Sequence, residues 1–167
     1  RITDALHRDD TQFIVIYGRR RIGKSTLIKH IVNARKQAVY FLSDTSVEAV
    51  QRAAFSKSVA MVIDGFDKVV YPDWESLFRS MNNQLSERII VCIDEFPYLV
   101  KSCDVLPSVI QKLLNEKKLK FDLILCGSSQ QLMHGYVLNR QSPLYGLANE
   151  IIKMRPIPAR YIGEAME

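Results

Sequence analysis

The sequence predicts an α/β domain in which a parallel, five-stranded sheet lies between two layers of helices. Two observations lead to this fold class. Short apolar runs alternate along the chain with stretches whose apolar residues recur at helical spacing. The apolar runs are also apolar at nearly every position, as strands buried on both faces of a parallel sheet are. With 167 residues, the chain suits one domain with one hydrophobic core.

Five segments are expected to form the strands of this sheet. The first of them ends at Gly18, and the third is strongly apolar throughout. Connections between parallel strands cross over right-handedly, so the strands should alternate with helices. The expected strands cover residues 12–17, 38–42, 88–93, 121–126 and 150–154.

Four helices are expected between the strands, over residues 26–35, 46–62, 72–85 and 107–116. Each places apolar residues three or four positions apart, so that one face of the helix can pack on the sheet. Asp73 precedes the apolar positions of the third helix and is expected to cap it. One apolar run also ends in an acid, Asp64. Gly65 follows it and the preceding stretch has a helical pattern, so Asp64 is assigned to a helix end or a loop.

The strongest motif is a phosphate-binding loop after the first strand. It fits the pattern G-x-x-x-x-G-K-[ST], also called Walker A, at every fixed position. Its first glycine ends the strand in a turn that a side chain would obstruct, and its second lets the backbone approach phosphates. Successive backbone N–H groups then form an anion nest at the positive end of the next helix. The nucleotide-binding set is Gly18, Arg19, Arg20, Arg21, Ile22, Gly23, Lys24, Ser25 and Thr26.

The side chains of this loop predict ATP and Mg²⁺ as its ligands. Lys24 is expected in an exposed loop, from which it reaches the β- and γ-phosphates as a point charge. Ser25 offers its hydroxyl to Mg²⁺. The side chains of Arg19, Arg20 and Arg21 either contact the phosphates or are solvated loop charges, and the sequence leaves both interpretations open.

The third strand delivers two acids to the same edge of the sheet. Asp94 follows an apolar run, which places it at the carboxyl end, where open α/β folds bind ligands. There it is expected to hold Mg²⁺ opposite Ser25, through the water shell of the ion. The next residue, Glu95, is expected to orient and deprotonate a water that attacks the γ-phosphate.

Two serines follow the fourth strand. One hydroxyl at this position can contact the γ-phosphate or the attacking water, and the other can cap a helix that begins near Gln130. We favour Ser128 for the first role and leave Ser129 for the cap. The catalytic set is therefore Lys24, Glu95 and Ser128.

Composition excludes several other classes of protein. The chain has 23 Lys and Arg against 18 Asp and Glu, and three of its cations are the consecutive arginines Arg19, Arg20 and Arg21 of the phosphate loop. No basic stripe interleaved with aromatic residues occurs elsewhere, which argues against direct nucleic-acid binding by this segment. No apolar run is long enough to span a membrane. Cys92, Cys103 and Cys126 fit no zinc or redox motif. Cys92 and Cys126 lie inside apolar runs, which favours packing roles and a reducing compartment, the cytoplasm.

With these strand ends placed, the chain resembles the archaeal-type ATPases of the AAA+/STAND group. The resemblance rests on residues 16–25, 93–99, 125–129 and 142–146, the last being Ser-Pro-Leu-Tyr-Gly, which is expected to form an ordered turn. It implies a P-loop NTPase sandwich with strand order 5-1-4-3-2. The strand before Ser128 would then lie between those before Gly18 and Asp94.

The resemblance also implies parts that this segment does not contain. A helical lid and further domains, often a winged helix and sometimes a nuclease-like one, would follow Glu167. Because Arg1 opens the chain without a Met, residues 1–167 are expected to be the ATPase core of a longer protein. A nucleic acid or a protein partner would bind through those domains, and assembly into an oligomer is left open.

One departure from the family pattern bears on hydrolysis of ATP and not on its binding. Such proteins carry an Arg directly after the Ser-Pro-Leu-Tyr-Gly turn, where this chain has Leu147. If that Arg serves as an arginine finger or sensor, hydrolysis by this segment is less well supported than binding. The leading function is Mg-dependent ATP hydrolysis that moves further domains. The alternatives are an ATP/ADP switch with little turnover and, less well supported because of Glu95, a small-molecule kinase.

Overall fold

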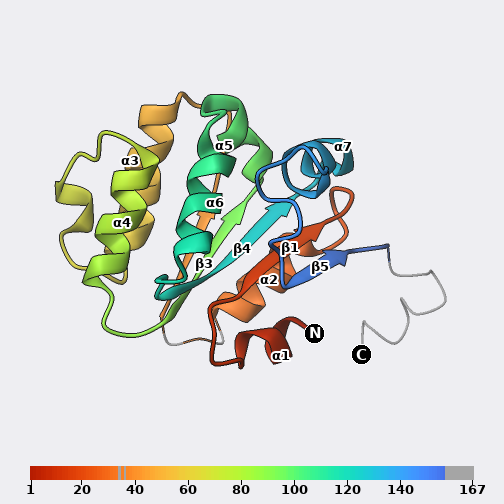
Figure 1. Cartoon of the computed structure of the whole chain (residues 1–167), viewed down its shortest axis with the longest axis horizontal. Coiled ribbons are helices and arrows are strands. Elements are labelled where there is room, and N and C mark those ends of the chain that lie inside the picture. The colour runs from red at the N-terminus through yellow and green to blue at the C-terminus, as the bar shows by residue number, and fades with distance from the viewer. Residues whose placement is uncertain (34, 36, 157–167) are drawn as a thin grey trace.

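The protein forms a three-layer α/β/α sandwich (Figure 1), seen in a computed structural model that describes residues 1–33, 35 and 37–156. All strand pairs are parallel, and the sheet order is β2-β3-β4-β1-β5, which confirms the expected order read from its other edge. The strand that precedes Ser128 accordingly lies between β1 and β3. The strands are β1 (Phe13–Tyr17), β2 (Ala38–Leu42), β3 (Ile89–Asp94), β4 (Phe121–Gly127) and β5 (Glu150–Lys153).

Helices connect the strands and cover both faces of the sheet. None in the described part of the chain has the length and apolar character needed to cross a membrane. The helices are α1 (Ile2–Leu6), α2 (Lys24–Asn33), α3 (Glu48–Ala60), α4 (Trp74–Gln84), α5 (Phe96–Ser102), α6 (Leu106–Glu116) and α7 (Gln130–Met133), with the short turns η1 (Phe66–Lys68) and η2 (His134–Leu138).

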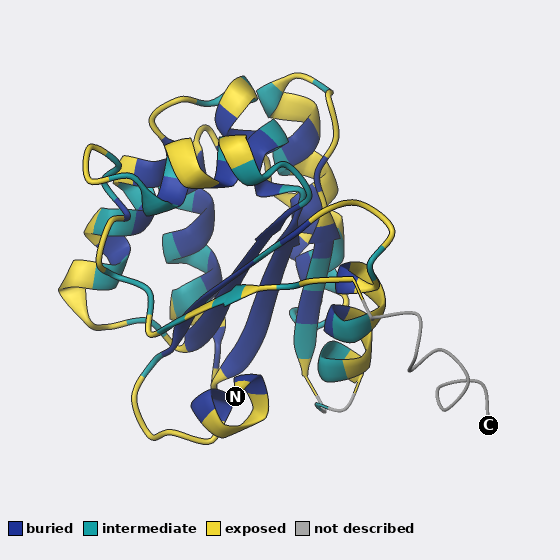
Figure 2. Ribbon diagram, turned by 90° about the vertical axis from the view of Figure 1, so that its right-hand side faces the viewer, coloured by how far each residue is buried: buried dark blue, intermediate teal, exposed yellow. Residues whose placement is uncertain are grey.

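Two hydrophobic clusters hold the layers together. The larger one packs α3, α4, α5 and α6 against alternate strand residues such as Val15, Val91 and Leu123. The smaller one packs Leu6 of α1 and Ile28 of α2 against the strand residues that point the other way. In Figure 2 the central strands are accordingly dark blue, and the outer faces of the surrounding helices are largely yellow. Burial on both faces explains why β3 and β4 are apolar without alternation.

Most expected elements are present, with ends shifted by one or two residues. Asp73 caps α4 by accepting from the backbone N–H of Ser76 at 2.7 Å, as expected. Asp64 lies exposed in the turn after α3, which confirms its assignment to a loop. Cys92 and Cys126 pack as free, buried thiols in the smaller cluster, as expected. The turn at residues 142–146 is ordered, since the amide of Tyr145 donates to the carbonyl of Ser142 at 3.1 Å.

Two short helices, α1 and α5, were not expected from the sequence, because 5 and 7 residues are too few to show a helical period. The helix expected near Gln130 is present as α7, which has 4 residues. The start of α2 was placed two residues too late, because its first turn belongs to the phosphate loop and has no apolar residue. The site depends on these pieces, since α5 and α7 follow directly on the ends of β3 and β4.

Candidate nucleotide-binding site

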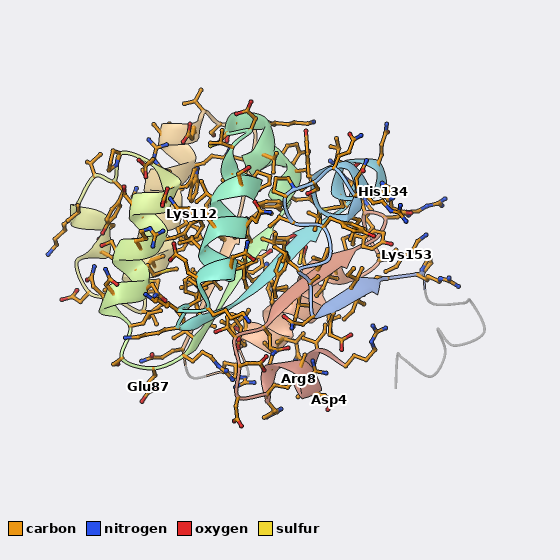
Figure 3. The ribbon with its side chains drawn as sticks, in the orientation of Figure 1. Asp4, Arg8, Glu87, Lys112, His134 and Lys153 are labelled. Carbon is orange, nitrogen blue, oxygen red and sulfur yellow. The ribbon has the colours of Figure 1, made fainter. Side chains whose placement is uncertain are left out.

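The carboxyl ends of β1, β3 and β4 meet at one edge of the sheet and bring the predicted residues together. Figure 3 marks this side of the molecule by His134 and Lys153, and the opposite side by Asp4 and Arg8. A cavity of about 270 Å³ at this edge is lined by Arg20, Arg21, Gly23, Lys24, Ser25, Thr26, Glu95 and Ser128. Larger hollows of about 510 and 620 Å³ lie elsewhere, but no residue of the phosphate motif lines either of them.

The two glycines of the phosphate loop are required by its geometry. A Cβ on Gly18 would lie 2.7 Å from both the Ile22 side chain and the carbonyl oxygen of Met154. Gly23 has φ of +87°, a conformation that side chains disfavour. Its carbonyl accepts from the amide of Leu27 at 2.9 Å, so the helical ladder of α2 reaches back into the loop. The loop therefore presents its backbone at the positive end of α2.

Lys24 is buried, with only 5% of its surface exposed, so the expectation of an exposed lysine was wrong. Its ammonium donates to the carbonyl oxygens of Gly18 at 2.6 Å and Arg19 at 2.5 Å. Burial lowers the pKa of Lys24 from its ordinary value, while the negative charges of Glu95 and Asp94 oppose that shift. The ammonium thus lies within the field of both acids.

Asp94 is 1% exposed, and its carboxylate contacts the Ser25 hydroxyl. Its Oδ2 accepts from the Ser25 hydroxyl at 2.8 Å and from the phenol of Tyr40 at 2.5 Å, and its Oδ1 accepts from the amide of Glu95 at 2.9 Å. Sequence reasoning missed Tyr40. Tyr40 pairs in register with Cys92 of β3, which lies two residues before Asp94. The side chains of Tyr40 and Asp94 therefore project from the same face of the sheet. Burial and the bond to Asp94 raise the pKa of Tyr40.

Glu95 has a left-handed backbone, with φ of 53°, where the chain turns from β3 into α5. Such a conformation is uncommon for a residue other than glycine and needs support from its surroundings. Ser43, after β2, gives that support, since its hydroxyl donates to the carbonyl oxygen of Asp94 at 2.9 Å and to that of Glu95. The turn directs the Glu95 carboxylate toward β4, where it accepts from the Ser128 hydroxyl at 3.1 Å.

The two serines after β4 divide the roles that the sequence left open. The Ser129 side chain caps α7 by accepting from the amide of Leu132 at 3.2 Å. Ser128 instead lines the cavity, next to Glu95. Ser128 is therefore the one placed to contact a phosphate, and its role as a sensor stays a prediction.

The three loop arginines differ in their surroundings, although all are exposed. Arg19 contributes its carbonyl to Lys24 and does not line the cavity. Arg21 lines the cavity and has φ of 62°. Arg20 also lines it, and its guanidinium is held on two sides, by the hydroxyls of Tyr98 at 3.0 Å and Ser128 at 3.4 Å.

The donor set fits a magnesium nucleotide better than a metal held by protein alone. Within the described residues, no group of three or more His, Cys, Asp or Glu side chains gathers as a metal site. Ser25 and Asp94 together offer hydroxyl and carboxylate oxygens, which Mg²⁺ prefers. Phosphate oxygens and water would supply the remaining ligands of an ion there, as they do for Mg²⁺ in nucleotide sites.

Leu147 lies away from this cavity. It packs on the larger cluster and lines the 620 Å³ hollow together with Thr11, Leu119 and Asn149. Those residues stand at the amino ends of β1, β4 and β5, the opposite edge of the sheet from the phosphate loop. A side chain at position 147 therefore belongs to a different surface from the one that holds Lys24.

Comparison with known sequences gives a match to one protein family over most of the chain. A family model described as the ATPase domain predominantly from Archaea matches residues 1–161. An uncharacterized protein of Methanocaldococcus jannaschii is 35% identical over 165 residues, covering 98% of this chain and 35% of the relative. The chain thus spans about a third of the length of that relative.

Comparison with solved structures supports the fold. The ORC1 protein of Aeropyrum pernix, solved in complex with DNA, aligns with 98% of this chain and 44% of its own, with TM-score 0.66 and 14% identity. Cdc6p from Pyrobaculum aerophilum aligns with 99% of this chain and 45% of its own, with TM-score 0.63 and 12% identity. At such identities the likeness concerns the fold alone.

Proposed function

The chain belongs to the family of ATPase domains found predominantly in Archaea, and we propose that it binds ATP with Mg²⁺ on residues 18–26 and hydrolyses it. The carboxyl-edge cavity carries the proposal, because it gathers from three separate segments the groups that phosphoryl transfer to water requires. These groups are Lys24, Ser25, Glu95 and Ser128.

Binding uses the backbone of the loop and one ammonium. The N–H groups of the loop and the first turn of α2 hold phosphate oxygens at the positive end of the helix. Lys24, which donates to two loop carbonyls, turns its ammonium to the β- and γ-phosphates. When bound, Mg²⁺ neutralises charge on the β- and γ-oxygens, and Ser25 and Asp94 are the residues placed to hold it.

Hydrolysis uses Glu95 as general base. Its carboxylate takes a proton from a water whose oxygen bonds to the γ-phosphorus. The bond from that phosphorus to the β–γ bridging oxygen breaks, and ADP leaves with the electron pair. General-base catalysis of this kind contributes about 10²–10⁴ in rate. Ser128 holds the carboxylate in place and is close enough to the cavity to contact the γ-phosphate.

A nucleotide-dependent switch with little turnover is the second candidate. The specific observation in its favour is Leu147, which stands where the family resemblance leads us to expect an arginine. Glu95 argues for hydrolysis, since a pure switch needs no group to activate water. The same acid argues against a small-molecule kinase, which must exclude water from its site.

We further propose that these residues are the ATPase core of a longer, cytoplasmic protein. The chain spans 35% of its relative from Methanocaldococcus jannaschii, which supports additional domains. The cycle would drive those domains on a nucleic acid or a protein partner. One solved structure with this fold, the ORC1 protein, was determined in complex with DNA. Three free cysteines support a reducing compartment.

Measurement of phosphate release from ATP tests the function, with and without Mg²⁺ and with and without candidate acceptors. An ATPase releases phosphate to water in a Mg-dependent reaction, whereas a kinase requires the acceptor. Turnover by residues 1–167 is compared with that of a longer form of the protein at matched concentration. We expect the segment alone to bind nucleotide and to turn over well below about 1 s⁻¹, the low end of typical enzymes. Slow turnover by both forms would favour the switch.

A further inference from the structure

We propose that Arg20 is the residue whose guanidinium binds the γ-phosphate of ATP, and that Tyr98 positions it. This inference rests on the proposed nucleotide function and names the cation that acts in it. The contacts of Arg20 connect three segments that are distant in the sequence. The Tyr98 hydroxyl is 78 residues away, and the Ser128 hydroxyl is 108 residues away.

The guanidinium of Arg20 is placed to face the γ-phosphate of a bound ATP. Arg20 lines the same cavity as Lys24 and Glu95. Its Nε lies 3.4 Å from the Ser128 hydroxyl, and that hydroxyl in turn donates to the Glu95 carboxylate at 3.1 Å. A single hydroxyl therefore lies between the guanidinium and the carboxylate of the proposed base. This is the region in which negative charge develops on the γ-phosphate during attack by water.

The hydrogen bonds of Arg20 leave its charge available. Both partners, Tyr98 and Ser128, are neutral hydroxyls. Within the described part of the chain, no carboxylate lies within 4.0 Å of the Arg20 guanidinium. Arg79 and Arg88, by contrast, each form an ion pair with a carboxylate. A guanidinium carries five N–H donors, and two are used here. The remaining fork suits two oxygens of a phosphate.

Tyr98 is placed to hold this side chain without touching the nucleotide. It lies on α5, one turn after Glu95, and does not line the cavity. Its ring faces the ammonium of Lys101 at 5.7 Å, while its hydroxyl reaches Arg20. Removal of the hydroxyl alone would therefore leave the packing of the ring intact and release one side of the guanidinium.

The position of Leu147 explains why the cation comes from the loop. The residue lies at the amino edge of the sheet, away from the cavity, so an arginine there would not reach a phosphate held by the same chain. The phosphate loop supplies a guanidinium directly. Of its three arginines, Arg20 alone is held by hydroxyls of both α5 and the end of β4.

The test compares affinities for ATP and ADP by calorimetric titration in the presence of Mg²⁺. In Arg20→Ala the affinity for ATP should fall at least about tenfold, with that for ADP little changed, since only ATP has the γ-phosphate. An arginine at that phosphate is worth about 10³–10⁵ in turnover, so hydrolysis should fall by a similar factor. Arg20→Lys should not restore it, because an ammonium lacks the planar fork.

Two further variants separate the role of Arg20 from a general loss of charge or fold. Tyr98→Phe should also lower the ratio of ATP affinity to ADP affinity, by a smaller factor than Arg20→Ala does. Arg140→Ala removes an exposed arginine that does not line the cavity and should leave the ratio unchanged. An unchanged ratio in Arg20→Ala, or an equal fall in Arg140→Ala, would overturn this inference alone. Absence of nucleotide binding by the wild-type chain would overturn the proposed function as well.

Discussion

The phenol of Tyr40 and the hydroxyl of Ser25 donate to the same oxygen of Asp94, at 2.5 and 2.8 Å. Tyr40 comes from the edge strand β2, so a residue outside the phosphate loop fixes the orientation of the carboxylate. If Ser25 turned its hydroxyl toward a bound Mg²⁺, Tyr40 would remain to hold Asp94. The edge strand is thereby part of the proposed metal site.

Tyr40→Phe should raise the Mg²⁺ concentration needed for half-maximal ATP binding, because the carboxylate loses a fixed donor. The same change should lower the free energy of unfolding by about 1.5–3 kcal/mol, the range for a hydrogen bond to a charged group. A magnesium titration of nucleotide affinity and urea unfolding measure the two effects. Tyr145→Phe, at a half-exposed tyrosine of the turn before β5, is the matched control. An unchanged magnesium requirement would show that Tyr40 does not act on this site.

Lys24→Ala should remove measurable Mg-ATP affinity in a calorimetric titration. The substitution deletes the ammonium expected at the β- and γ-phosphates. The structure adds a second effect, a modest loss of stability, because the carbonyls of Gly18 and Arg19 lose their donor. Lys57→Ala, which removes an exposed lysine of α3, should retain wild-type affinity. If Lys24→Ala also retains it, the site assignment is wrong.

Glu95→Gln should keep ATP bound while turnover falls by a factor of about 10²–10⁴. The amide oxygen can still accept from the Ser128 hydroxyl, so the local geometry should survive. The amide cannot take a proton from water at neutral pH. Single-turnover phosphate release and equilibrium binding are measured on the same samples. Unchanged turnover would remove Glu95 as the base, and loss of binding would instead assign it a structural or metal-linked role.

Asp122→Asn should change how stability depends on pH. Asp122 is buried at the start of β4, and burial raises its pKa, against the opposing effects of the Gln12 amide and Arg88. The folded state therefore binds this proton more tightly than the unfolded state. Stability from this group is complete below the ordinary pKa of 3.8 and is lost as pH rises through the higher folded value.

Asparagine cannot ionise, and its Oδ1 can still accept from the Gln12 amide. Wild type should accordingly lose stability relative to Asp122→Asn as pH rises above 3.8, until the carboxyl is fully ionised. Urea unfolding of both proteins across this interval measures the difference, in which other titrating groups cancel. Parallel curves, or a relative gain by wild type, would contradict the burial argument. Arg88 stays held by the carbonyls of Asp9 and Asp10 in either case.

The sequence predicted the elements with strong local signals and missed those that depend on neighbours in space. The apolar runs gave all five strands, and the motif resemblance gave their order. Tyr40 and Ser43 carry no local signal, because their contacts with Asp94 exist only once β2 pairs with β3. Lys24 was expected to be exposed because motif spacing does not show which way a long side chain folds.

The pairing of β1 has a consequence for how this protein folds. Both neighbours of β1 lie far from it in the sequence, with contacts between residues 110 positions apart toward β4 and 136 toward β5. Closing such long loops slows folding, so the phosphate loop takes its final shape only once β4 and β5 have paired with β1. A nucleotide that binds as proposed would bind the assembled sheet and not its precursors. A nucleotide at about 100 times its dissociation constant would add about 2.7 kcal/mol to stability. If the protein binds ATP as proposed, the supply of ATP would act on the amount of folded protein as well as on its turnover.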